Sequence, residues 1–222
     1  MPGRSPPRQL ALALPHAESF GREDFLPGPS NRAALTLIES WPDWPSRVVA
    51  VVGPEGSGKS HLAAIWAADA GARFLAGRAL SLSQVPAALA TGALVVEDVE
   101  RPDERALFHL LNLAREDDAY VLLTARMPPA AWNIALADLA SRLRAVPSVV
   151  LSPPDDALLR ALLVKLFADR QVAVDESLIG YLSARLERSF AAAQAAVDRL
   201  DREALRRKRP VSRALAVEMF GT

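Results

Sequence analysis

A glycine-rich loop at residues 53–60 carries the residue types and spacing of a phosphate-binding site. Its residues match the pattern G-x-x-x-x-G-K-[ST] and are Gly53, Pro54, Glu55, Gly56, Ser57, Gly58, Lys59 and Ser60. Glycines let backbone N–H groups converge on phosphate oxygens, and the N-terminus of a following helix adds positive potential. We expect the Lys59 ammonium to contact the outer phosphates and the Ser60 hydroxyl to ligate Mg²⁺. The alternative is a glycine-rich strand-to-helix turn that holds no ligand.

Two carboxylates follow an apolar run and are candidates for the metal side of this site. Leu94-Val95-Val96 is typical of a buried strand, and Glu97 and Asp98 come directly after it. We expect Glu97 to lie at the metal or its waters and Asp98 to orient an attacking water. Two solvated acids at a strand end are the alternative. ATPases of this type usually have Asp first, so Glu97 is a departure, and we expect the chain's own ATP hydrolysis to be weak or absent.

A third polar strand end is Thr124, after the apolar run that begins at Tyr120. Its hydroxyl could contact the γ-phosphate or the attacking water. A threonine that simply ends a strand is an equal alternative.

The elements that must position these residues alternate between strand and helix along the chain. Hydrophobic periodicity and turn residues predict strands at 48–52, 73–76, 93–98, 120–124 and 148–151, and helices at 31–41, 60–70, 84–90 and 104–115. Such alternation implies parallel strands joined by right-handed crossovers, and fully apolar strands imply a sheet covered on both faces. The sequence therefore predicts an α/β fold of three layers, αβα.

Composition changes mark two further segments. Residues 1–22 are rich in Pro and Arg without a helical period, which predicts an extended or disordered, flexible arm. After Pro153-Pro154 the pattern is helical, beginning with an apolar stripe from Leu158 to Phe167. We expect an arm at 1–22, the α/β domain at 23–153 and a small all-helical lid at 154–222.

The overall composition excludes several classes of protein. The chain has 222 residues, no cysteine, and 26 basic residues that balance 26 acidic ones. Disulfide frameworks and thiol chemistry are excluded, and no segment is apolar enough to span a membrane or resembles a signal peptide. We expect a cytoplasmic protein whose direct binding to DNA is weak or absent, because no strong positive charge favours it.

Several motifs together resemble the AAA+ ATPases of the DnaA group and, within that group, the short Hda regulators. The residues that carry the resemblance lie in order at 25–31 (FLPGPSN), 58–62 (GKSHL), 95–99, Ser141-Arg142 and Pro153-Pro154, across about residues 23–200. The resemblance implies an adenine pocket that includes Leu26, Pro27 and His61, with ADP or ATP bound. It also implies that Arg142 is an arginine finger acting in trans, with Arg144 as a competitor.

Differences within the family sharpen the expectation. By this resemblance we expect no helix-turn-helix domain of the initiator type, and the arm carries Gln9, Leu10, Leu12 and Leu14 in the arrangement of the Q-L-x-L-x-L peptide of Hda proteins. That peptide binds the DNA polymerase sliding clamp. A flexible tail or an edge strand is the alternative for this motif.

The lid position that carries a sensor arginine in the family is Ala191 here, and Arg188, one turn earlier, is the candidate substitute.

The resemblance implies a function in the regulatory inactivation of DnaA. Anchored to the clamp, the protein would stimulate hydrolysis of the ATP bound to DnaA, and self-assembly is compatible with this role. One alternative is a helicase loader or initiator-like ATPase that grips DNA through the basic cluster at 206–209. Another is a self-sufficient P-loop enzyme such as a small-molecule kinase.

Overall fold

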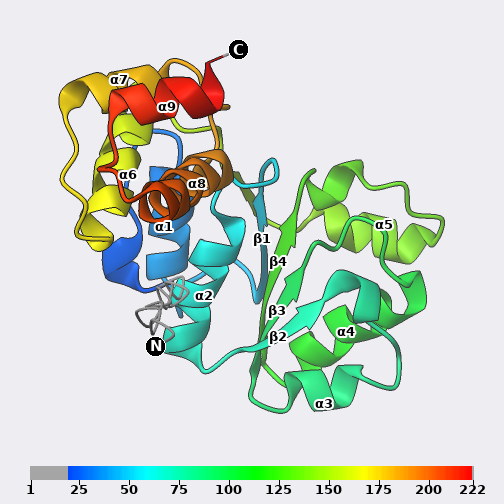
Figure 1. Cartoon of the computed structure of the whole chain (residues 1–222). Coiled ribbons are helices and arrows are strands. Elements are labelled where there is room, and N and C mark those ends of the chain that lie inside the picture. The colour runs from blue at the N-terminus through cyan, green and yellow to red at the C-terminus, as the bar shows by residue number, and fades with distance from the viewer. Residues whose placement is uncertain (1–19, 222) are drawn as a thin grey trace, which may run out of the picture.

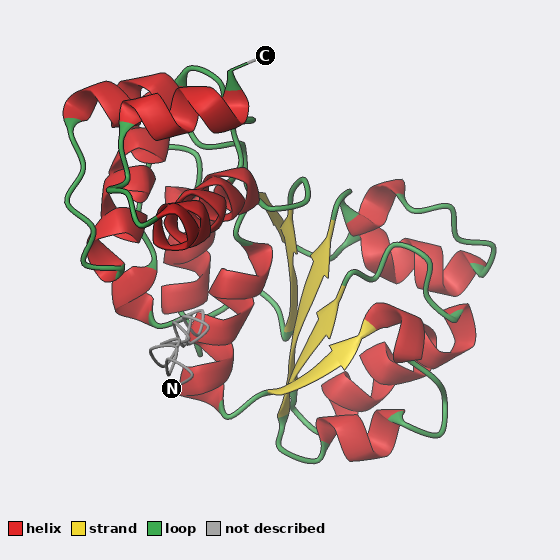
Figure 2. Ribbon diagram, in the orientation of Figure 1, coloured by secondary structure: helices red, strands yellow, loops and turns green. Residues whose placement is uncertain are grey.

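The computed structural model describes residues 20–221, so the arm motif with Gln9, Leu10, Leu12 and Leu14 lies outside the described residues. In this part of the chain, five parallel strands form one sheet in the order β2-β3-β4-β1-β5 (Figures 1 and 2). The strands are β1 (Val48–Val52), β2 (Arg73–Ala76), β3 (Ala93–Glu97), β4 (Tyr120–Ala125) and β5 (Ser148–Val150). β1 and β4 lie side by side near the centre, so the loops that follow them are neighbours.

Helices cover both faces of the sheet (Figure 1). One face packs against α1 (Arg32–Glu39) and α2 (Lys59–Ala70), and the other against α3 (Val85–Leu89), α4 (Glu104–Glu116) and α5 (Ala137–Arg144). Alternate residues of one strand enter opposite cores: Val49 and Val51 lie with α1 and α2, whereas Ala50 and Val52 lie with α3 to α5. This alternation explains why β1 can be entirely apolar and β-branched, and it confirms the predicted three-layer α/β fold.

The chain after the sheet is helical and forms its own core. It comprises α6 (Asp156–Asp169), α7 (Glu176–Ser183), α8 (Phe190–Arg207) and α9 (Arg213–Phe220). The apolar stripe predicted from Leu158 to Phe167 is buried in this cluster, against residues of α7 and α8. Side chains of Asp155, Asp175 and Ser189 accept backbone N–H groups at the starts of α6, α7 and α8. Figure 1 shows these helices beside α1 and α2, on that side of the sheet.

Short 3₁₀ turns occur at η1 (Arg22–Asp24), η2 (Gly77–Ala79) and η3 (Pro129–Ala131). Among the described residues, no helix combines the length and the apolarity that crossing a membrane requires.

Several element boundaries differ from the prediction by one or two residues, and two differences bear on the candidate site residues. The strand predicted at 93–98 ends at Glu97, because Asp98 adopts a left-handed backbone with φ of 52°. Arg142 lies in the last turn of α5, a helix that is not among those predicted from the sequence. The backbone positions of Asp98 and Arg142, which set where their side chains begin, could therefore not be predicted from hydrophobic periodicity alone.

Candidate functional site

The loop between β1 and α2 is shaped by glycines that other residues could not replace. Gly56 and Gly58 have φ of 70° and 98°, in the left-handed region that favours glycine. A Cβ on Gly53 would lie 2.8 Å from the Leu151 carbonyl oxygen and 2.8 Å from Ser57 Oγ. The Ser57 hydroxyl is buried without a hydrogen-bond partner. The loop thus has the tight backbone that a phosphate cradle requires.

Lys59 begins α2 and lies under this loop. Its ammonium donates to the carbonyl oxygens of Gly53 (2.9 Å) and Pro54 (2.8 Å), and the residue is only 7% exposed. Burial lowers the pKa of Lys59, while the nearby Asp98 and Glu100 carboxylates oppose that shift. An ammonium has three N–H donors, so one remains to bind an anion in the cavity.

The acidic turn after β3 is fixed from the neighbouring strand. Thr124, which is 1% exposed, accepts the Asp98 N–H at its Oγ1 (3.1 Å), and its carbonyl accepts the Val99 N–H (3.1 Å). Gly77 packs beneath the turn, since a Cβ there would lie 2.8 Å from the Asp98 carbonyl oxygen. Asp98 therefore faces the loop from a rigid turn, whereas Glu97 is half-buried and does not line the cavity.

Arg126 and Glu100 belong to the site, although sequence reasoning missed them. Arg126 follows β4 directly, and its guanidinium pairs with Glu55 of the loop at 2.9 Å. Its backbone N–H donates to Glu100 Oε1 at 2.6 Å. The signal that could have found Arg126 is its place after the strand that neighbours β1, since parallel strands end at the same edge of a sheet.

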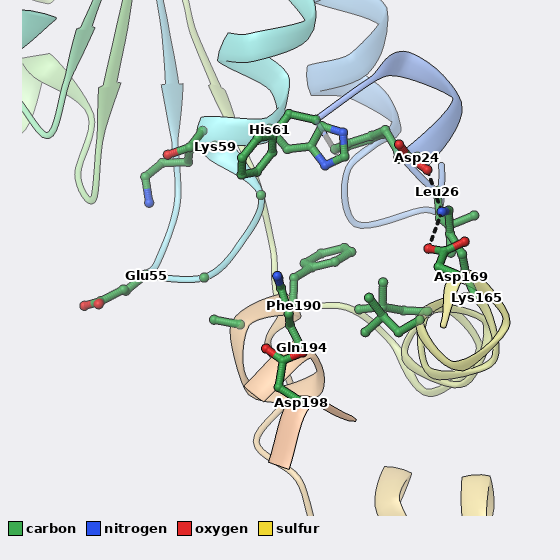
Figure 3. A pocket seen from close by; sticks show the side chains of 18 of the residues that line it. Asp24, Leu26, Glu55, Lys59, His61, Lys165, Asp169, Phe190, Gln194 and Asp198 are labelled. Carbon is green, nitrogen blue, oxygen red and sulfur yellow. Dashed lines mark hydrogen bonds and ion pairs between the residues drawn. The ribbon is translucent and has the colours of Figure 1, made fainter. Parts of the chain in front are cut away.

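A cavity of about 720 Å³ lies between this edge of the sheet and the lid (Figure 3). One side carries Lys59 and Glu55, and the opposite side carries Lys165 and Asp169 of α6. Phe190, Gln194 and Asp198 of α8 form a third wall. The volume falls in the range of ligand pockets that bury most of a small molecule.

The wall farthest from Lys59 joins the N-terminal segment to the lid. Lys165 donates to Asp24 (2.6 Å) and Asp169 (2.7 Å), and the dashed lines in Figure 3 mark both contacts. Burial disfavours the charged form of Lys165, but the hydrogen bonds to Asp169 and Asp24 outweigh it and raise the pKa of Lys165. This ion triad closes one end of the cavity.

His61 ties the same N-terminal segment to the loop helix. Its Nε2 lies 2.9 Å from the Gly21 carbonyl oxygen, and its ring meets Phe20 and Phe25 edge-on at 5.4 and 5.2 Å. Phe20, Phe25 and Leu26 line the cavity beside it. The arrangement provides an apolar and aromatic end opposite the charged loop, as a nucleotide base would need.

The lid is docked on the loop itself at the start of α8. The Phe190 N–H donates to the Gly56 carbonyl oxygen (2.9 Å), and a Cβ on Gly56 would lie 2.7 Å from the Ala191 Cβ. Ala191 therefore occupies the lid position nearest the loop with a methyl group. Arg188 lies outside the cavity lining and pairs with Asp156 at 2.9 Å.

Arg142 lies outside the cavity lining as well. Its guanidinium sits over the ring of Phe108 in α4, 4.9 Å from the centroid, while Arg144 is exposed. A guanidinium in this place does not act on a ligand in the chain's own cavity.

The structure brings many of the sequence-predicted residues together at the cavity. Those that line it are Leu26, Glu55, Gly56, Gly58, Lys59, Ser60, His61 and Asp98. Others shape the site without lining it: Gly53, Pro54 and Ser57 within the loop and Thr124 behind the acidic turn. Four further predicted site residues also do not line the cavity: Pro27, Glu97, Arg142 and Arg188.

The residues fit Mg²⁺ bound together with phosphate rather than by protein alone. Among residues 20–221 there is no group of three or more His, Asp or Glu side chains that could hold a metal. Mg²⁺ typically takes one or two protein oxygens together with substrate phosphates and water. The Ser60 hydroxyl and the Asp98 carboxylate, both at the cavity, are the oxygen ligands in position, and Glu97 lies one residue back.

Comparison with solved structures identifies the fold. Domain III of the Thermotoga maritima replication initiation protein DnaA is similar, with a TM-score of 0.75 and 16% identity over 91% of this chain and 95% of that one. The replication initiator DnaA bound to AMPPCP and single-stranded DNA is similar with a TM-score of 0.66 and 19% sequence identity, over 84% of this chain and 66% of that one. The Thermotoga maritima RuvB Holliday junction branch migration motor is similar with a TM-score of 0.73 and 18% sequence identity. The match covers 90% of this chain and 70% of that one.

These similarities show that the chain has the AAA+ fold that DnaA and RuvB share. No model of a known protein family and no curated protein sequence matches it.

Proposed function

We propose that this protein binds an adenine nucleotide with Mg²⁺ in the cavity and restrains replication initiation by promoting hydrolysis of the ATP held by DnaA. The observation that carries the nucleotide assignment is the loop with Lys59 beneath it, facing a cavity of about 720 Å³ in a DnaA-like fold. The DnaA homologue whose structure contains AMPPCP supports adenine as the base.

Each wall of the cavity has a defined task in this proposal. The glycine-rich loop and Lys59 hold the phosphates, while Phe25 and Leu26 cover the base. Ser60 and Asp98 hold the metal, which neutralises phosphate charge when bound. The direct contact of Phe190 with Gly56 lets the lid follow any movement of the loop. The nucleotide thus acts chiefly as a structural switch between sheet domain and lid.

The catalytic effect on DnaA is assigned to Arg142. A guanidinium that lies outside the chain's own cavity is available to another molecule's nucleotide site, which supports action in trans. An arginine supplied in this way stabilises transition-state charge and is worth about 10³–10⁵ in rate. Arg142 is half-buried, and its cation–π contact with Phe108 positions the side chain but is weak enough, at about 0.5–2 kcal/mol, to be exchanged on docking.

The partner that localises the protein is the DNA polymerase sliding clamp. The support for this part is the arm sequence with Gln9, Leu10, Leu12 and Leu14, in which leucines at every second position form one apolar row on an extended peptide. Binding through such a short peptide raises the local concentration of the protein at replicated DNA.

The decisive experiment measures ATP hydrolysis by DnaA in the presence of DNA-loaded clamp. We expect the wild type to stimulate hydrolysis, Arg142→Ala to abolish stimulation, and a chain lacking residues 9–14 to lose it at the same protein concentration. Arg144→Ala tests the competing arginine two residues away, and we expect it to retain stimulation; loss of stimulation with Arg144→Ala alone would transfer the role from Arg142 to Arg144. Unchanged hydrolysis with wild-type protein and loaded clamp would refute the proposed function.

A second candidate function, a DNA-gripping helicase loader, has one observation in its favour. Arg199, Arg202, Arg206 and Arg207 line an open groove on α8 together with two glutamates. However, Arg206 and Arg207 pair with Glu203, and Arg207 also pairs with Glu218, so much of this positive charge is neutralised. Salt-dependent DNA binding by the isolated protein would favour this alternative over the first.

A further inference from the structure

The helix that carries Arg142 starts without a capping side chain of its own. α4, α6, α7, α8 and α9 each begin after an aspartate or serine whose side chain accepts a backbone N–H group of the first turn. α5 begins after Leu136, which has no side-chain oxygen that could accept one. The polar groups at the start of α5 therefore find their partners outside the helix.

Glu104, in the first turn of α4, supplies these partners. Its two carboxylate oxygens accept the N–H groups of Ala135 (2.9 Å) and Leu136 (2.8 Å), which lie 31 and 32 positions later in the chain. Hydrogen bonds to an ionised carboxylate are stronger than bonds between neutral groups, and two parallel bonds fix direction as well as distance. Because Glu104 is half-buried, water competes with these bonds only in part.

The end of α5 is held on the same face of α4. The Arg142 guanidinium lies over the ring of Phe108, 4.9 Å from its centroid. Phe108 follows Glu104 by four residues, so both side chains project from one face of α4. Between these two contacts, Leu139 and Leu143 are buried in the core beneath α5. Figure 1 shows α5 beside α4, on the face of the sheet away from the lid.

The apolar and polar contacts of α5 fix different things. Burial of Leu139 and Leu143 is non-directional, so it keeps α5 on the core without setting its place along α4. The Glu104 carboxylate does set that place, because it is bonded to particular backbone atoms. Arg142 lies six residues beyond Leu136, which is about 9 Å along a helix. A shift of the start of α5 therefore moves the guanidinium with it.

We propose that Glu104 is a positioning residue for Arg142. Its carboxylate holds the start of α5 so that the guanidinium enters the partner's nucleotide site in the orientation that stabilises the transition state. The contact of Arg142 with Phe108 is released on docking, whereas the bonds from Glu104 remain and keep the helix in place. Glu104 itself touches neither nucleotide. This inference rests on the proposed function, since it requires Arg142 to act on the ATP held by DnaA.

The first test measures ATP hydrolysis by DnaA with DNA-loaded clamp over a range of concentrations of the full-length protein. Glu104→Ala is expected to lower the maximal stimulated rate about tenfold or more, because a small misplacement of a reacting group costs up to about 10² in rate. The concentration that gives half-maximal stimulation is expected to change less than about threefold. Glu104→Gln is expected to fall between wild type and Glu104→Ala, since it keeps the side-chain length and one accepting oxygen.

Glu116→Ala is the matched control, because it removes an exposed glutamate at the opposite end of α4. It is expected to leave the maximal rate unchanged. A variant that is merely unstable contains fewer folded molecules, so its half-maximal concentration rises while the maximal rate is recovered at high concentration. Urea unfolding of each variant identifies that case independently.

The second test measures amide hydrogen exchange in the protein alone. Loss of the carboxylate is expected to speed the exchange of residues 140–144 of α5 about tenfold or more in Glu104→Ala, while β4 keeps its protection. Glu116→Ala is expected to leave both segments unchanged.

Two outcomes would overturn the inference alone. A maximal rate for Glu104→Ala equal to that of the wild type would show that Arg142 does not depend on Glu104. Unchanged exchange at residues 140–144 would show that the carboxylate does not hold α5. Absence of stimulation by the wild type would overturn the proposed function and, with it, any role of Glu104 in hydrolysis. That result is distinct, because in the other two cases the wild type stimulates DnaA.

Discussion

Replacement of Thr124 by valine tests how the acidic turn is held in place. Thr124 is 1% exposed, and its hydroxyl accepts the Asp98 N–H at 3.1 Å, while Asp98 has an unfavourable φ of 52°. Valine keeps the shape of the threonine side chain but cannot accept a hydrogen bond. The Asp98 N–H therefore loses its partner, which costs about 1–3 kcal/mol of stability. Because Asp98 itself is exposed, water can replace part of the bond, and we expect the lower end, about 1 kcal/mol.

For a chain of this size, about 1 kcal/mol corresponds to a fall in Tm of roughly 2–4 °C. Urea unfolding should show a lower midpoint with an unchanged slope, since the exposed area on unfolding stays the same. Thr124→Ser is the control, because it keeps the hydroxyl, and we expect it to be more stable than Thr124→Val. If the valine and serine variants have the same midpoint, or if valine matches the wild type, the hydroxyl does not hold the turn.

Three further perturbations bear on other parts of the molecule. Gly56→Ala should destabilise the protein by about 2 kcal/mol in urea unfolding, because φ is 70° and the new Cβ would lie 2.7 Å from that of Ala191; wild-type stability would refute this. A double-mutant cycle with Lys165→Met and Asp24→Asn should give a coupling near 1 kcal/mol, and additivity would contradict the triad. The pKa of Glu203 is lowered to about 2 by hydrogen bonds from two arginines. Its stabilising effect is therefore complete above pH 4.5 and lost as the pH falls toward 2, so the difference in urea midpoint between wild type and Glu203→Gln should shrink over that interval.

Local sequence patterns predicted the elements well where one physical cause dominates. β1 is a β-branched run buried on both faces, and its ends coincide with the prediction. The glycine-rich loop and Lys59 were found because phosphate binding demands particular residues at fixed spacing. β3 was predicted one residue too long, since the left-handed backbone of Asp98 depends on Thr124 and Gly77, which are distant in sequence.

Features that arise from tertiary neighbours could not be predicted in the same way. The pair between Arg126 and Glu55 joins residues 71 positions apart, and neither residue carries a local pattern that indicates the other. Arg188 was assigned to the nucleotide from its place one turn before the expected arginine, but the start of α8 directs it to Asp156 instead. Arg188 precedes α8, in the connection that follows α7, so the path of that connection and not a helical period sets its position.

The walls of the cavity have a consequence for the order of folding. Lys165 and Asp24 are 141 positions apart, and the Phe190 N–H closes on Gly56 from the other end of the chain. Contacts of such separation form late, because the entropy of closing a long loop must be overcome first. The cavity is therefore complete only when α8 has packed, and a nascent or truncated chain that ends before Phe190 lacks one of its walls. A ligand that contacts all of these walls binds only the fully folded protein. By mass action, such binding stabilises the folded state against unfolding.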